Sequence, residues 1–89
     1  MSVVTIYSTA ICPYCVAAKN FLSNRGVAWE EVRIDLDPVR RQEMLDKARR
    51  TSVPQIFVGD VHIGGYDDLV ALARDGGLDE LLQGSSSAD

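Results

Sequence analysis

Both cysteines of this 89-residue chain lie in one tetrapeptide, Cys12-Pro13-Tyr14-Cys15. Two thiols three residues apart on the first turn of a helix lie on the same side of it, so they can close a disulfide or open to a dithiol. Pro13 suits the first helical position, because its missing N–H is not needed there and its φ is already helical. The tetrapeptide therefore predicts a redox-active pair at a helix start, with Cys12 at the N-cap.

The two sulfurs of this pair should differ in reactivity. A free thiol has a pKa of about 8.5, and the thiolate is the nucleophile. The unpaired N–H groups and the dipole of a helix start favour an anion, which should lower the pKa of Cys12 by about one unit. Hydrogen bonds from the N–H groups of Tyr14 and Cys15 would add to this effect. Cys15 lies inside the first turn on the apolar side, so we expect Cys12 to attack and Cys15 to resolve.

The composition limits what else the chain can be. Its 46% apolar residues suffice for one small domain that folds without a metal or a structural disulfide. Two cysteines and one histidine cannot supply the four ligands of a structural zinc site. A net charge of −4 argues against a nucleic-acid partner. No signal-like start and no membrane-length apolar run occur, so a cytoplasmic location without membrane attachment is expected.

The apolar patterns and the turn residues predict a single α/β domain. The expected strands are residues 3–7, 28–34, 55–58 and 61–63. The expected helices are 13–25, 38–50 with Asp37 as its N-cap, and a segment from Asp67 or Asp68 to Arg74. One or two amphipathic turns follow near residue 80. The order β-α-β-α-β-β-α gives a four-stranded mixed sheet flanked by helices. We expect this domain to span residues 1–83, with a flexible tail at 84–89.

Three motifs stand at spacings that match one known family. They are Cys-Pro-Tyr-Cys at 12–15, Thr-Ser-Val-Pro-Gln-Ile-Phe-Val at 51–58 and Ile-Gly-Gly-Tyr-Asp-Asp-Leu at 63–69. Together they resemble the dithiol glutaredoxins, and most of all the small bacterial members, over roughly residues 3–82. The resemblance implies a thioredoxin-like fold and glutathione-dependent reduction of protein disulfides and protein-glutathione mixed disulfides. Glutathione would be the reducing co-substrate, and protein substrates with catalytic disulfides, such as ribonucleotide reductase, would be partners. We expect a monomer without metal.

The resemblance also implies which residues form a glutathione site. It implies a cis bond at Pro54 and a Val53 backbone free to pair with an extended peptide, whereas the residues alone would favour an ordinary trans proline at a strand start. The corner after the last strand would hold the γ-glutamyl end, through Gly65 and the helix start at Asp67 and Asp68.

Two of these assignments have simpler alternatives. Asp67 could do no more than cap its helix, which is worth about 1 kcal/mol. Tyr14 could contribute a hydroxyl or a ring edge to the site, or be only a partly exposed aromatic residue.

One departure from the family concerns charge. Many relatives carry a lysine shortly before the first cysteine, but residues 7–11 of this chain contain no cation. A basic group lies farther along the sequence and is either a solvated helix face or an anion-receiving patch: Arg40, Arg41, Lys47, Arg49 and Arg50. We expect the glycine carboxylate of glutathione to bind among its four arginines.

The same motifs leave two other functions open. The chain could be a redoxin reduced by thioredoxin reductase, or a dimer that holds an iron-sulfur cluster through Cys12 and bound glutathione. His62 has no acid or cysteine at a telling spacing and is expected to be a half-exposed strand residue. Trp29, Phe21 and Phe57 are expected in the core.

Overall fold

The structure, a computed structural model, describes residues 3–87. Its elements are β1 (Val4–Ser8), α1 (Pro13–Asn24), β2 (Trp29–Arg33), α2 (Pro38–Ala48), β3 (Gln55–Val58), β4 (Val61–Gly64), α3 (Tyr66–Arg74) and α4 (Gly77–Ser87). The predicted strands and helices are therefore present. In this part of the chain no helix combines the length and the apolar character that a membrane crossing needs.

The four strands form one mixed sheet in the order β2-β1-β3-β4. β1 is parallel to β2 and antiparallel to β3, and β3 and β4 form an antiparallel hairpin. The central position of β1 explains its composition, because both of its faces are covered: Ile6 is fully buried on one face and Tyr7 is 2% exposed on the other. The four-stranded mixed sheet predicted from the sequence is confirmed.

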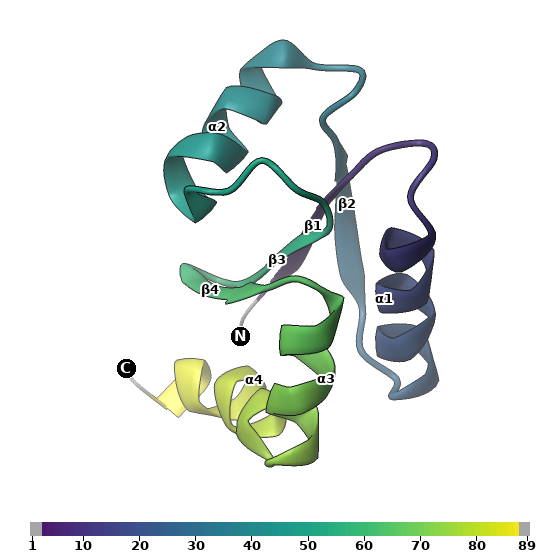
Figure 1. Ribbon diagram of the computed structural model, residues 1–89. Helices are drawn as coiled ribbons and strands as arrows, with labels where there is room; N and C mark the ends of the chain where they lie inside the picture. Colours follow the sequence, from purple (N-terminus) through teal and green to yellow (C-terminus); the bar gives the residue numbers. More distant parts are fainter. Residues whose placement is uncertain (1–2, 88–89) are drawn as a thin grey trace.

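Helices cover both faces of the sheet (Figure 1), as expected. α1, α3 and α4 pack with β1 and β3 around the larger apolar cluster, which includes Leu22, Leu69 and Leu78. α2 covers the opposite face and encloses a smaller cluster with Met44. The three aromatic residues expected in the core are there: Phe57 is buried in the smaller cluster, and Phe21 and Trp29 pack against the larger one.

Helix starts and ends follow local signals with two differences. The Asp37 carboxylate accepts hydrogen bonds from the N–H groups of Val39 (3.0 Å) and Arg40 (3.3 Å), so the predicted cap of α2 is confirmed. α2 ends slightly early, because Arg49 takes the left-handed conformation. α4 reaches Ser87 and so includes residues assigned to a tail. The domain boundary at residue 83 stays a prediction.

Candidate functional site

The cysteine pair lies at the junction between the loop after β1 and the start of α1. Cys12 is the N-cap, with extended dihedral angles of −151° and 95°, and Pro13 is the first helical residue, as predicted. The two cysteines form a disulfide, and the N–H of Cys15 lies 3.1 Å from the Cys12 sulfur. This is one of the two N–H contacts expected at that sulfur. A negative charge on Cys12 would therefore face a donor that is already in place.

The two cysteines differ in exposure. Cys15 is 1% exposed and Cys12 is 8% exposed, so Cys12 is the less deeply buried residue of the pair. This difference has the direction that the sequence predicted for an attacking and a resolving cysteine. The roles themselves remain to be tested by substitution.

The loop before β3 lies against Cys12. The Val53-Pro54 bond is cis, as the family resemblance implied. The Val53 carbonyl oxygen lies 3.7 Å from the Cys12 sulfur, a contact without a hydrogen bond while the sulfur is in a disulfide and carries no proton. The loop thus brings one backbone carbonyl to the sulfur of Cys12, the more exposed cysteine of the pair.

The corner between β4 and α3 forms the other side of the site. α3 begins at Tyr66 with Gly65 as its N-cap, so the expected start at Asp67 or Asp68 is one to two residues late. The alternative in which Asp67 caps the helix is wrong. Asp68, at the third helical position, accepts a hydrogen bond from the Gly65 N–H (2.9 Å), which is the one half of a capping box that a glycine N-cap allows. The sequence interpretation missed this cap because glycine has no capping side chain.

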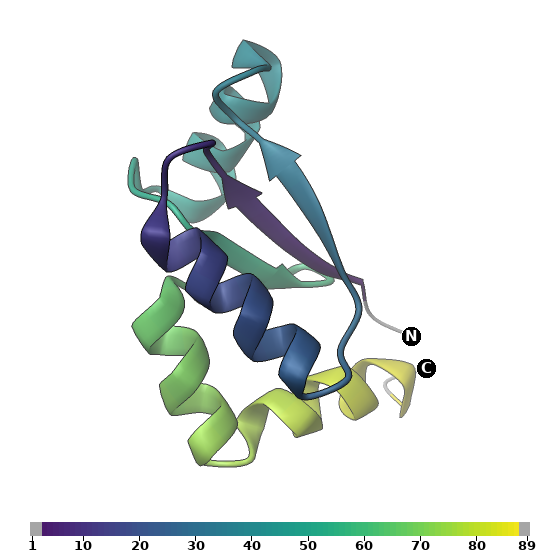
Figure 2. The ribbon, with the colours of Figure 1, turned by 90° about the vertical axis from the view of Figure 1, so that its right-hand side faces the viewer.

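A cavity of about 250 Å³ opens between these two segments. The starts of α1 and α3 lie side by side there (Figure 2), and the rings of Tyr14 and Tyr66 are 6.1 Å apart. All six residues predicted to bind glutathione line the cavity: Tyr14, Val53, Pro54, Gly65, Asp67 and Asp68. Four further lining residues were not predicted as part of the lining: Arg50, Ser52, Gln55 and Tyr66. The structure therefore brings the predicted set together, and its binding role stays a prediction.

One member of the basic group contributes a positive charge to the lining of this cavity. Of the four arginines expected to receive a carboxylate, Arg50 lines the cavity, and its guanidinium lies 3.4 Å from the Asp68 carboxylate. Arg40 lies on α2, outside the lining of the cavity, and pairs with Glu43 at 3.5 Å. The basic residues are thus divided between two surfaces, and Arg50 is the candidate that replaces the missing lysine.

The loop that lacks the lysine is held by an acid instead. The N–H of Ala10 donates to the Asp35 carboxylate at 3.1 Å. Hydrogen bonds from Arg33 lower the pKa of Asp35 to about 2, so this carboxylate is ionised under ordinary conditions. The segment before Cys12 is therefore tied to the loop after β2 by a charged acceptor.

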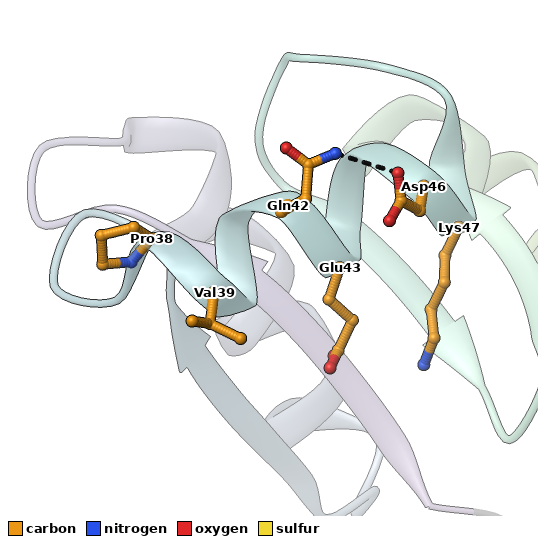
Figure 3. Close-up of a pocket in the computed structure, with 6 residues that line it drawn as sticks. All are labelled: Pro38, Val39, Gln42, Glu43, Asp46 and Lys47. Carbon is orange, nitrogen blue, oxygen red and sulfur yellow. Dashed lines mark hydrogen bonds between the residues drawn. The ribbon is translucent and has the colours of Figure 1, made fainter.

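A larger hollow, of about 660 Å³, lies on α2 and shares no lining residue with the cysteine site. Figure 3 shows it along one helix, where the Gln42 amide donates to Asp46 at 2.9 Å. Glu43, also in this hollow, accepts the hydroxyl of Tyr7 at 2.5 Å. Gln42 thus pairs with Asp46, and Glu43 pairs with Tyr7. The residues that line this hollow include neither cysteine. Residues 3–87 also contain no cluster of three or more His, Cys, Asp or Glu side chains placed to hold a metal.

Comparison with known proteins points to one family. The family model described as Glutaredoxin matches residues 4–63. Glutaredoxin 3 of Escherichia coli (strain K12) is 51% identical over 83 residues, which cover 93% of this chain and all of the relative. A glutaredoxin of Pseudomonas aeruginosa is 51% identical over 82 residues, covering 92% of this chain and 98% of the relative.

Solved structures agree with this result. The solution structure of glutaredoxin from Brucella melitensis has a TM-score of 0.80 and 44% identity, covering 93% of this chain and 90% of that one. A buckwheat glutaredoxin-glutathione complex has a TM-score of 0.81 and 26% identity, covering 91% of this chain and 76% of that one. The thioredoxin-like fold expected from the sequence is confirmed.

Proposed function

This chain belongs to the glutaredoxin family of thiol-disulfide oxidoreductases, and from that premise we propose that glutathione is its electron donor. Its substrates would be protein disulfides and protein-glutathione mixed disulfides. The observation that carries the proposal is the cavity beside Cys12, which joins a helix start, two carboxylates and one guanidinium in one small volume.

The chemistry of this cavity matches the ends of glutathione. The γ-glutamyl end carries a carboxylate and an ammonium on one carbon; the free N–H groups at the start of α3 suit the first, and the Asp67 or Asp68 carboxylate suits the second. The glycine carboxylate at the other end suits Arg50. Bound between these groups, the tripeptide would place its sulfur toward Cys12. Val53 and Pro54 line the cavity, and the Val53 carbonyl oxygen contacts the Cys12 sulfur.

The proposed reaction proceeds by thiol-disulfide exchange. The Cys12 thiolate attacks one sulfur of a substrate disulfide, forms a mixed disulfide and releases the other substrate sulfur as a thiolate. For a protein disulfide, Cys15 attacks the Cys12 sulfur and releases the reduced protein. Two glutathione molecules then reduce the Cys12-Cys15 bond in two exchanges and leave as glutathione disulfide. For a glutathionylated protein, Cys12 takes the glutathione and a second glutathione removes it.

Replacement of each cysteine tests this scheme. Cys12→Ser should abolish both activities, because it removes the attacking sulfur. Cys15→Ser should lose reduction of protein disulfides but retain removal of glutathione from a mixed disulfide. Both variants are assayed beside the wild type with NADPH and glutathione reductase, using a glutathione mixed-disulfide substrate and a protein disulfide. Equal loss of both activities in Cys15→Ser would contradict the assignment.

The electron donor has its own control. The same assay is repeated with NADPH and thioredoxin reductase in place of glutathione and its reductase. Turnover that requires thioredoxin reductase would refute glutathione as the donor while leaving the family assignment intact.

The charge assignment has a matched pair of variants. Arg50→Gln should raise the KM for glutathione, because Arg50 lines the cavity, whereas Arg40→Gln should leave it unchanged. An unchanged KM in Arg50→Gln would refute the role given to this guanidinium.

A further inference from the structure

A chain of hydrogen bonds leads from the edge strand β4 to the wall of the cavity. Gln55, the first residue of β3, is fully buried although its side chain is polar. Its side-chain oxygen lies 2.7 Å from Nε2 of His62. Its side-chain nitrogen donates to the carbonyl oxygen of Ser52 at 3.0 Å and to the Ser52 hydroxyl at 3.4 Å. His62 is thereby connected through Gln55 to the loop that holds Val53.

The sheet explains why these residues meet. His62 pairs with Phe57 in the hairpin, so the two side chains lie on the same face. Gln55 lies two residues before Phe57 on the same strand and therefore shares that face. The His62 ring stacks on Phe57 at 4.8 Å between ring centres, which fixes its plane. The ring nitrogen is thus held toward the Gln55 amide by packing on a rigid strand.

The direction of every hydrogen bond in this chain is determined. Because the Gln55 nitrogen donates to Ser52, the Gln55 oxygen must accept, and Nε2 of His62 must carry a proton. Burial, and to a smaller extent Arg50, lowers the pKa of His62, while Asp68 acts in the opposite direction. The neutral ring protonated at Nε2 donates this bond, and the imidazolium would donate it as well.

We propose that His62 is a positioning residue for the cavity: by donating to Gln55 it fixes the loop of Ser52, Val53 and Pro54. Ser52 and Pro54 line the cavity, and Val53 both lines it and contacts the Cys12 sulfur. A change in the tilt of this loop would therefore change the distance between bound glutathione and Cys12. The inference rests on the proposed function, since it concerns the wall of the same cavity.

Two substitutions of His62 separate its hydrogen bond from its packing. His62→Phe keeps a ring to stack on Phe57 but removes the donor, so the buried Gln55 oxygen loses its partner. His62→Gln loses the ring but keeps an amide N–H that reaches about as far as Nε2 does. Trp29→Phe is the matched control, because it removes another side-chain hydrogen bond, to Ser23 at 3.1 Å, on the far strand β2.

The test measures KM and kcat for glutathione, together with the backbone amide peaks of Ser52 and Val53 in ¹H-¹⁵N NMR spectra. His62→Phe should raise the KM about fivefold, as expected for one lost hydrogen bond, with kcat at saturation within about twofold of the wild type. It should also move both amide peaks. His62→Gln and Trp29→Phe should keep the wild-type KM and peak positions.

The inference would be overturned if the two His62 variants changed the KM in the opposite order. If His62→Gln is impaired and His62→Phe is not, His62 acts only by packing against Phe57. If the wild type shows no glutathione turnover, the proposed function fails, and the amide peaks decide the positioning role alone. Peaks that move in His62→Phe then support that role, and unmoved peaks overturn it.

Discussion

Replacing Gly64 by alanine should damage the corner between β4 and α3 more than a loss of backbone freedom alone would. Gly64 has a φ of +119°, a conformation that residues with a side chain rarely adopt. A methyl group at this position would also overlap the Asp68 carboxylate. Because that carboxylate caps α3 through the Gly65 N–H, alanine has to displace the cap as well.

The expected cost is the sum of two effects. Forcing alanine into this backbone conformation costs about 1–3 kcal/mol. Losing the hydrogen bond that the Gly65 N–H donates to Asp68 costs about 1 kcal/mol. The Asp68-Arg50 pair adds little, because both side chains are about half exposed and solvent screens them. Gly64→Ala should therefore lower the free energy of unfolding by about 2–4 kcal/mol, a fall of at least about 8 °C in Tm for a domain of this size.

A double-mutant cycle separates the two effects. In Asp68→Ala the cap is already lost, so adding Gly64→Ala costs only the backbone strain. The double variant should then be about as stable as Gly64→Ala alone, and the coupling between the two sites should be about 1 kcal/mol. Gly26→Ala is the control for a positive φ without a clash, since its φ is +73° and no atom lies within 4 Å of the added carbon.

Urea unfolding of the wild type, the variants Gly64→Ala and Asp68→Ala, their double variant and the control gives all the required free energies. Strictly additive costs at Gly64 and Asp68 would show that the two positions do not meet, and the account of this corner would be refuted. The same samples can be assayed for their KM for glutathione, which should rise in each variant of the corner and stay unchanged in Gly26→Ala.

Substitutions at three further residues probe the rest of the domain. Burial and then a hydrogen bond to Glu43 raise the pKa of Tyr7 to about 12, against about 10 in the unfolded chain. Stability from Tyr7 is therefore complete below pH 10 and should fall by up to about 2–3 kcal/mol as the pH rises to 12, and urea unfolding of Tyr7→Phe should lack this loss. Asp37→Ala should cost about 1 kcal/mol and Asp37→Asn much less, because asparagine still caps α2, as thermal unfolding can show. A hydrogen bond from Lys19 is the main reason for the lowered pKa of Glu31, so the ionised Glu31 stabilises the fold and this stabilisation is lost as the pH falls. In Glu31→Gln, the free energy of unfolding should therefore fall less steeply at acid pH than in the wild type.

Local features of the site could be predicted from the sequence because their causes lie within four residues. Cys12 followed by Pro13, and Asp37 followed by Pro38, each combine an acceptor with a residue already set for a helix. The cap at Gly65 escaped prediction although Asp68, the group that completes it, is only three residues away, because glycine has no acceptor side chain that would mark an N-cap.

Some features that depend on how segments pair could not be predicted from the sequence. Arg40 and Arg50 are close in sequence, but the rise of α2 from Arg40 to Ala48 alone is about 12 Å. His62 gave no signal because its partner is a glutamine on another strand, reached only once the hairpin register is fixed. A polar residue at the start of the apolar run 55–58 was the one available sign, since a fully buried glutamine needs partners.

The first residue of β1 and the last residue of α4 indicate where a probe can be attached to this enzyme. β1 begins at Val4 and runs toward the cysteines, so Val4 lies about 13 Å behind Ser8, the end of the strand nearer the redox centre. α4 ends at Ser87 on the same rear side in both views (Figures 1 and 2). A fluorophore, a surface tether or a fused sensor attached beyond either element would leave the approach to Cys12 open.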